Sequence, residues 1–185
     1  MKLVPLKIAG TFRIELTPSR DERGFFVRTY DNSLFAAQGL VTDWIQESHS
    51  FSTQKGTVRG LHIQCAPYGE TKLIRVAYGK IFMAFIDLRP HSQTFKQADH
   101  IILSAQEPEL VYVPKGLAMG MCTLSDNATL LYKMDMLYHP ESARTIIWND
   151  PDINIPWPVK EASMMSDRDK NAPRLKDLLA KEKLV

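Results

Sequence analysis

The sequence has few cysteines, little excess charge and no long apolar run. Its two cysteines among 185 residues have no metal-binding or redox spacing, which argues against a disulfide scaffold. Lys plus Arg number 23 and Asp plus Glu 21, so the formal net charge is only +2 and the basic excess of a nucleic-acid binder is missing. No apolar run approaches the roughly 20 residues of a membrane span, and the first residues lack the apolar stretch of a signal peptide. We therefore expect one cytoplasmic domain over residues 1–185, acting on neither nucleic acid nor membrane.

Short runs rich in Val, Ile, Phe and Tyr dominate the sequence instead, separated by 11 prolines and nine glycines. We read about eleven strands at roughly ten-residue spacing, a pattern typical of an antiparallel sandwich or barrel and not of a Rossmann-type sheet. A hairpin is predicted at residues 78–80. A short helix is predicted after Asp31, ending near Gly39. Residues 150–185 are predicted to form a C-terminal arm and a helix that begins near Ala172.

The densest cluster of polar residues lies in Gly56–Gln64, followed downstream by Pro114–Gly120. Strand alternation predicts that four residues of the first segment share one face: Val58, Gly60, His62 and Gln64. The two segments resemble the halves of the cupin signature, whose four metal-ligand positions are filled here by His62, Gln64, Glu70 and Met119. A thioether is a poor ligand for hard divalent metals. We therefore expect an all-β, cupin-like double-stranded β-helix (jelly roll) with a few short helices and a metal-free site.

Several strings over most of the chain resemble the dTDP-4-dehydrorhamnose 3,5-epimerase family, in the family's order. They are Arg20–Phe26, Val58–Gln64, Lys72–Val76, Asp87–Arg89, Leu131–Lys133, Tyr138–Pro140, Ile147–Pro151 and Ser166–Asp169. That family is a dimeric jelly roll that epimerises nucleotide-linked 4-keto-6-deoxy sugars. The resemblance implies a homodimeric isomerase without metal or cofactor, acting in deoxysugar synthesis for O-antigen, lipopolysaccharide or a related glycoconjugate.

Four residues match the family's catalytic positions. A 4-keto group acidifies the hydrogens on C3 and C5, so epimerisation needs a base, an acid on the opposite ring face and a group that stabilises the enolate. The resemblance assigns the base to His62, since imidazole titrates near neutral pH, and its carboxylate partner to Asp169. It assigns the acid to Tyr132 and the cation near the keto oxygen to Lys72.

The remaining matches imply contacts with the nucleotide. Arg23 and Arg59 match residues that meet the diphosphate, where a guanidinium fork is expected. Phe26 matches the ring that stacks on the base. Other positions are assigned to the pocket: Gln46, Ser48 and Ser50 in one strand, Met119, and Tyr138 near the sugar. Plain structural roles are the alternative: Phe26 and Tyr138 as core aromatics, and Arg23 as an ion-pair partner of Asp21 or Glu22.

Two pairs of departures from the family bear on specificity. Met119 and Met83 replace a histidine and its aspartate partner, so both members of a polar pair are apolar here. We hypothesise that the enzyme inverts one carbon, C3, although neutral drift in a core pair is the alternative. Arg28 replaces a glutamate placed to accept from thymine, and Ser48 replaces an asparagine. Because arginine only donates hydrogen bonds, we hypothesise a CDP-linked substrate instead of a dTDP-linked one. The alternative is that Arg28 turns to solvent or meets a phosphate and leaves the choice of base unchanged.

Two other functions remain open from the sequence. A keto-isomerase on the same fold would share the enolate but deliver a proton at C4 or its oxygen. A sugar-nucleotide-binding module would bind without turnover. The full acid–base set favours epimerisation over both.

Overall fold

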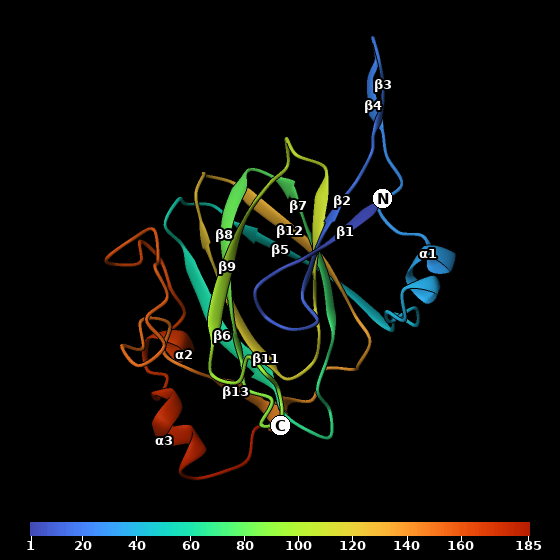
Figure 1. Ribbon diagram of the computed structural model, residues 1–185. Coiled ribbons are helices and arrows are strands. Elements are labelled where there is room, and N and C mark those ends of the chain that lie inside the picture. The colour runs from blue at the N-terminus through green and yellow to red at the C-terminus, as the bar shows by residue number, and fades with distance from the viewer.

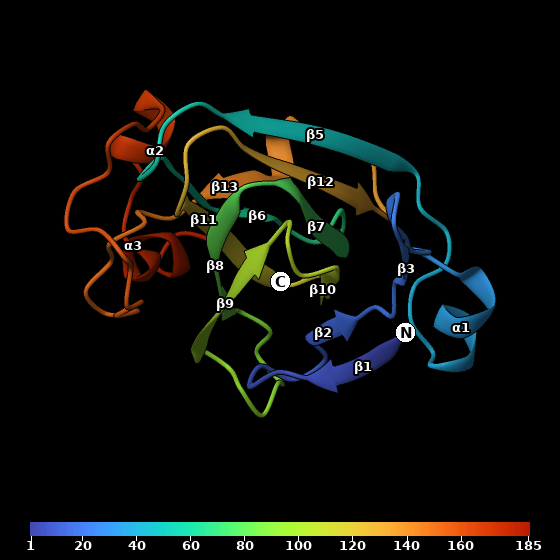
Figure 2. The same cartoon turned by 90° about the horizontal axis from the view of Figure 1, so that it is seen from above.

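Two antiparallel sheets face each other and form the body of the molecule (Figures 1 and 2). The computed structural model describes residues 1–185. The six-stranded sheet contains, in spatial order, β1 (Lys2–Pro5), β2 (Phe12–Glu15), β10 (Glu109–Val113), β7 (Lys72–Tyr78), β12 (Ala128–Met134) and β5 (Gln46–Ser52). The five-stranded sheet contains β13 (Ala143–Thr145), β6 (Val58–Gln64), β11 (Leu117–Thr123), β8 (Lys80–Asp87) and β9 (Ala98–Ser104). The predicted all-β jelly roll is confirmed, with a few short helices.

Strand β8 shows how the core is built. Ile81, Met83 and Phe85 point into the main core between the two sheets. The alternate residues Phe82 and Ala84 point outward and are also buried. A strand covered on both faces reads as a continuous apolar run, which is why β8 is apolar along nearly its whole length.

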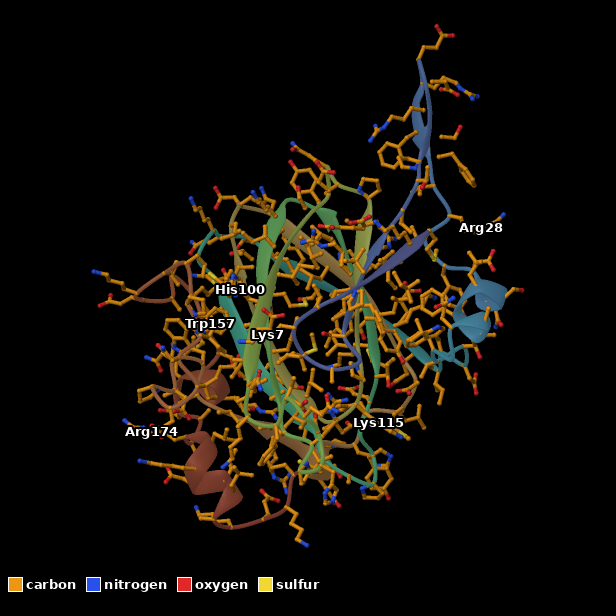
Figure 3. The ribbon with its side chains drawn as sticks, in the orientation of Figure 1. Lys7, Arg28, His100, Lys115, Trp157 and Arg174 are labelled. Carbon is orange, nitrogen blue, oxygen red and sulfur yellow. The ribbon has the colours of Figure 1, made fainter.

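The C-terminal arm covers the outer face of the five-stranded sheet. It carries α2 (Asp167–Lys170) and α3 (Leu175–Leu179), which Figure 1 shows in red beside β6. Trp157 of the arm lies 5.4 Å from the Phe82 ring, which also stacks on His100 of β9; Figure 3 shows Trp157 and His100 on the same flank. The predicted C-terminal helix is shorter than expected and begins at Leu175. Leu184 is nevertheless 2% exposed, because the segment after α3 packs on the core in non-helical form. None of the helices is long and apolar enough to cross a membrane.

A two-stranded hairpin projects from the body near the N-terminus. It consists of β3 (Ser19–Asp21) and β4 (Gly24–Phe26), and Figure 1 shows it standing clear of the sheets. Helix α1 (Asn32–Ala37) follows as predicted, with Asp31 Oδ1 accepting from the Leu34 N–H. A single-turn 3₁₀ helix (Pro140–Ser142) precedes β13. The hairpin contributes no residue to either main sheet.

The hairpin predicted at residues 78–80 is wrong. The turn is present, with Gly79 at a φ of +78°, but β7 before it belongs to the six-stranded sheet and β8 after it to the five-stranded sheet. The turn is therefore a corner between the sheets. Turn residues indicate where the chain reverses, whereas strand pairing depends on tertiary packing.

A bulge in β6 changes which of its side chains face the interior. His62 pairs with Met119 and Arg59 with Met121, so Gly60 and Leu61 together lie opposite Gly120. Two residues opposite one is the definition of a β-bulge. The predicted common face of Val58, Gly60, His62 and Gln64 is therefore wrong before the bulge, at Val58, while His62 and Gln64 beyond it border the same cavities. His62 shares its face with Arg59, while Val58 packs into the outer core.

Gly60 is required at the bulge, and alanine there is expected to destabilise the protein. Its φ is +105°, and an added Cβ would lie 2.6 Å from the Met119 carbonyl oxygen. Backbone strain of this kind costs about 1–3 kcal/mol, which corresponds to a fall in melting temperature of about 3–10 °C. We expect Gly60→Ala to show a fall of this size, with the steric overlap adding to it. Gly39→Ala is the matched control, since Gly39 has a φ of +67° and no neighbour within 4 Å. Equal melting temperatures for the two variants would show that steric overlap at Gly60 is unimportant.

Candidate active site

A cavity of about 200 Å³ lies between the two sheets. The six-stranded sheet contributes its polar wall through Ser50, Lys72 and Tyr132. The five-stranded sheet contributes Arg59 and His62 from the opposite side. A ring bound in this cavity therefore has His62 on one sheet and Tyr132 on the other.

His62 forms a short hydrogen bond with Asp169. His62 Nε2 lies 2.6 Å from Asp169 Oδ1, and the Asp169 side chain is 4% exposed while that of His62 is 40% exposed. Ser166 caps α2 by accepting from the Asp169 N–H at 3.2 Å, and Asp169 Oδ2 accepts from the Gly60 N–H at 3.3 Å. The carboxylate is thus fixed from α2 and β6 together, and the imidazole Nδ1 has no hydrogen bond within the protein.

Asp169 stays ionised despite its burial. Desolvation alone would raise the pKa of its carboxyl group, but the hydrogen bond and charge of His62, with smaller contributions from Gly60 and Ser166, lower that pKa below its usual value. An ionised carboxylate accepts a hydrogen bond from the Nε2–H. The other ring nitrogen, Nδ1, is then the one with a free lone pair. This arrangement suits a base that must take a proton from a carbon acid.

Lys72 and Tyr132 come from neighbouring strands of the six-stranded sheet. Tyr132 of β12 lies opposite Ser48 on one side and Ile74 of β7 on the other. Lys72 is the first residue of β7, and its Nζ lies 2.8 Å from Glu70 Oε1. Both side chains border the cavity that contains His62.

A second cavity, of about 400 Å³, adjoins the first and shares His62, Lys72 and Tyr132 with it. It also contains residues assigned to the pocket from the sequence: Gln46, Ser48 and Tyr138. Gln46 Oε1 accepts from the Tyr138 N–H at 2.9 Å, which ties the segment after β12 to β5. The structure therefore brings these residues together with the matched acid–base residues.

Two arginines of this second cavity were missed from the sequence. Arg168 borders it and donates from Nε to Thr145 Oγ1 at 2.8 Å. Arg144 borders it too, but its guanidinium is occupied by Glu182. Arg168 stands beside Asp169 in the Ser166–Asp169 string, so proximity to a matched residue was the available signal.

Arg59 is held at the first cavity by β5. Its Nε donates to Ser52 Oγ at 3.2 Å and its Nη2 to the Phe51 carbonyl at 3.0 Å. Ser50 of the same strand borders the cavity as predicted. The guanidinium therefore lies at the edge of the cavity with donors to spare for an anion.

Three residues that the sequence assigns to the nucleotide do not border the first or the second cavity of their own chain. Arg23 and Phe26 are on the projecting hairpin, with the Arg23 side chain 86% exposed and Phe26 73% exposed. Arg23 Nη2 bonds Asp21 Oδ2 at 2.6 Å, the ion pair that the plain structural alternative predicts. Arg28 is at the foot of the hairpin, on the outside of the molecule (Figure 3), and its Nη1 lies 3.2 Å from Asp31 Oδ2. The hairpin pairs only with itself, so nothing in its own chain draws these side chains inward.

The four positions of the cupin metal signature do converge. His62, Gln64, Glu70 and Met119 border one small cavity of about 10 Å³, together with Lys72. Their polar atoms have other partners: the Gln64 amide nitrogen donates to the Tyr68 and Leu137 carbonyls, and Glu70 pairs with Lys72. No group of three or more His, Cys, Asp or Glu side chains lies close enough to hold a metal ion.

The floor of the first cavity is rich in methionine. Met83, Met119 and Met121 all border it, and they are 2%, 9% and 5% exposed. Met83 lies directly opposite Met121 across β8 and β11. This floor offers polarisable contact surface but no proton donor or acceptor of useful strength.

Comparison with known proteins identifies the family. Residues 5–177 match the family model for dTDP-4-dehydrorhamnose 3,5-epimerase. The enzyme of that name from Shigella flexneri is 37% identical over 178 residues, which are 96% of this chain and 97% of the relative.

Solved structures give the same result. A dTDP-4-dehydrorhamnose 3,5-epimerase from Bacillus anthracis, with TDP and PPi bound, superposes with a TM-score of 0.91 at 37% identity, covering 94% of this chain and 99% of the other. ChmJ, a 3'-monoepimerase from Streptomyces bikiniensis in complex with dTDP-quinovose, has a TM-score of 0.87 at 30% identity, covering 95% and 90% of the two chains. The chain belongs to the dTDP-4-dehydrorhamnose 3,5-epimerase family, whose members are isomerases.

Proposed function

We propose that the protein epimerises a nucleoside-diphospho-4-keto-6-deoxyhexose through an enolate. The observation that carries this proposal is the placement of His62 and Tyr132 on opposite sheets around one cavity. A 4-keto sugar bound between them would lose a carbon-bound proton to one wall and become a flat enolate. The enolate would then gain a proton at the same carbon from the other wall, which inverts that carbon. The family and its ligand-bound relatives support the substrate class.

His62 acts as the base in this proposal. Asp169 accepts a hydrogen bond from the Nε2–H, so Nδ1 takes the proton from the carbon beside the keto group. The imidazolium that forms is stabilised by the buried carboxylate. Lys72 faces the same cavity and stabilises the oxygen as it becomes negative. Tyr132 then gives a proton to the opposite face of the carbon.

The remaining residues of the two cavities bind the rest of the substrate, the sugar and the nucleotide. Arg59 and Ser50 are placed at the first cavity, and Gln46, Ser48 and Tyr138 at the second. We assign the diphosphate to Arg59, because a guanidinium fork matches phosphate oxygens. Arg168 borders the second cavity and adds a further positive charge there. Residues 1–185 act as one domain in this proposal, with the arm of residues 150–185 supplying Asp169.

The active unit is proposed to be a homodimer. The hairpin exposes Phe25 at 51% and Phe26 at 73% and stands clear of its own body (Figure 1). An isolated two-stranded hairpin is marginally stable in water, so packing against a second copy would stabilise it. Arg23 and Phe26 would then meet the nucleotide in the partner subunit. Sedimentation of the protein as a monomer at assay concentration would contradict this arrangement.

The base of the nucleotide is a separate question. The relatives with bound TDP and dTDP-quinovose support a thymidine nucleotide. Arg28 supports CDP, since cytosine presents acceptors to a guanidinium, but Arg28 already donates to Asp31 within its own chain. We therefore favour dTDP and keep CDP as the alternative. Calorimetric titration should show tighter binding of dTDP; tighter binding of CDP would reverse this choice.

The number of carbons inverted depends on the methionine floor. Met83, Met119 and Met121 supply no proton relay, so we propose that C3 alone is inverted. The 3'-monoepimerase ChmJ shares the fold, which supports one inversion as a function of this architecture.

The test is incubation with dTDP-4-keto-6-deoxyglucose in deuterated water, read by NMR. We expect deuterium at C3 and inversion there. Deuterium and inversion at both C3 and C5 would show a double epimerase. Binding without any exchange would show a binding module, and a 3-keto product would show a keto-isomerase.

A cytoplasmic location is also proposed. Cys65 and Cys122 are both free and buried. Burial raises the pKa of the Cys122 thiol to about 11. Unpaired thiols are typical of a reducing compartment.

A further inference from the structure

A largely shielded ion pair lies beside the substrate cavity, and one of its members, Glu70, has no role in the steps above. Lys72 Nζ lies 2.8 Å from Glu70 Oε1, and the two side chains are 16% and 14% exposed. Lys133 and Glu47, a pair on the same sheet, are 3.4 Å apart and 34% and 51% exposed. Exposed pairs contribute little to stability or position, whereas loss of one partner from a buried pair leaves an uncompensated charge. Glu70 therefore constrains Lys72 far more than Glu47 constrains Lys133.

Glu70 lies beside Lys72 but outside the first cavity. Lys72 borders the first cavity, which holds Tyr132 and the methionine floor, whereas Glu70 borders only the second and the small third cavity. An ammonium group has three N–H donors and no acceptor. The Glu70 carboxylate therefore attracts the ammonium from outside the first cavity, and N–H donors remain for a ligand within that cavity.

The backbone around the pair is also held. Thr71, between the two residues, is 3% exposed, and its N–H donates to Asp135 Oδ1 at 2.6 Å. Asp135 directly follows β12, the strand that carries Tyr132. The ion pair is thus fixed relative to the residue proposed as the acid.

We propose that Glu70 is a positioning residue that directs the Lys72 ammonium at the keto oxygen. This inference rests on the proposed function, in which Lys72 stabilises the enolate. Without the carboxylate the ammonium is free to turn toward other anions, the substrate diphosphate among them. The enolate, where charge develops, then loses the stabilisation that Lys72 supplies, whereas substrate binding is kept.

Steady-state kinetics of Glu70→Ala and Glu70→Gln, with Glu47→Ala as the matched control, test the proposal. We expect Glu70→Ala to lower kcat by about 10- to 100-fold, as misplacement of a catalytic group does, with KM within about twofold of wild type. Glu70→Gln should recover part of the loss, because the amide oxygen offers the ammonium a partial negative charge at the same place. Glu47→Ala should keep the wild-type kcat.

The same substitution in a Lys72→Gln background separates positioning from a general structural role. If Glu70 acts through Lys72, Glu70→Ala has little further effect on kcat there. An equal loss in both backgrounds, or a wild-type kcat for Glu70→Ala, would overturn the proposal. Absence of deuterium exchange in the wild-type enzyme would instead refute the proposed function, so the two failures are distinguishable.

Discussion

Replacing His62 by alanine is expected to lower kcat by about 10²- to 10⁴-fold, the usual contribution of a general base. His62 is the one imidazole that borders the first cavity, and its Nδ1 is free of protein hydrogen bonds. Solvent deuterium exchange into the substrate should fall by the same factor, since proton abstraction precedes both. The measurement is exchange and product formation by NMR at saturating substrate.

Binding should be much less affected than turnover in this variant. Arg59 and the residues of the second cavity remain, so the dissociation constant for dTDP should change by less than about threefold. His139→Ala is the control, because that ring stacks on Tyr68 at 3.6 Å and borders neither main cavity. Wild-type exchange in His62→Ala would remove His62 from the mechanism.

Asp169→Asn gives an independent view of the same dyad. An amide can donate to Nε2, which would place the imidazole proton on Nδ1 and remove the lone pair that acts as the base. A comparable exchange in a hydrolase triad lowers kcat about 10⁴-fold. The low pKa of the Asp169 carboxyl means that the wild-type dyad keeps this acceptor ionised across neutral pH.

The strands were largely predictable, but their pairing was not. Residues 72–78, one of the strands expected from the sequence, form β7 with those bounds, because they contain a short run rich in apolar residues that ends at the turn residue Gly79. The short strands β1 and β3 were not predicted, since none of their residues is buried and their sequences carry no apolar pattern of a core strand. The reversal at residues 78–80 was read as a hairpin, because local sequence does not reveal that the chain changes sheets there.

The site was predictable only through resemblance. His62 and Asp169 are 107 positions apart, and α2, which places Asp169, has four residues and no apolar periodicity. The bulge at Gly60 was invisible to strand alternation, which placed Val58 on the same face as His62. Arg23 and Phe26 lie on a hairpin that borders neither of the two main cavities of its own chain, so their proposed contacts require a second copy.

Replacing Lys72 by glutamine is expected to lower kcat by about 10²- to 10³-fold, the cost of losing one preorganised group that stabilises an oxyanion. Glutamine is preferred to methionine because its amide can still donate to Glu70, so that no buried carboxylate is left unpaired. Lys133→Gln is the control, since that ammonium belongs to an exposed pair of the same sheet.

The exchange pattern of Lys72→Gln distinguishes enolate stabilisation from proton transfer. Loss of the cation raises the energy of the enolate, so deuterium incorporation and inversion should fall together. If Lys72 were instead the acid that reprotonates the carbon, exchange through His62 would persist while inversion stopped. His62 and Tyr132 occupy opposite sheets, and Lys72 starts the strand beside that of Tyr132. Parallel loss of both signals would therefore leave Tyr132 as the acid and the ammonium as the group that makes the carbon acidic enough to react.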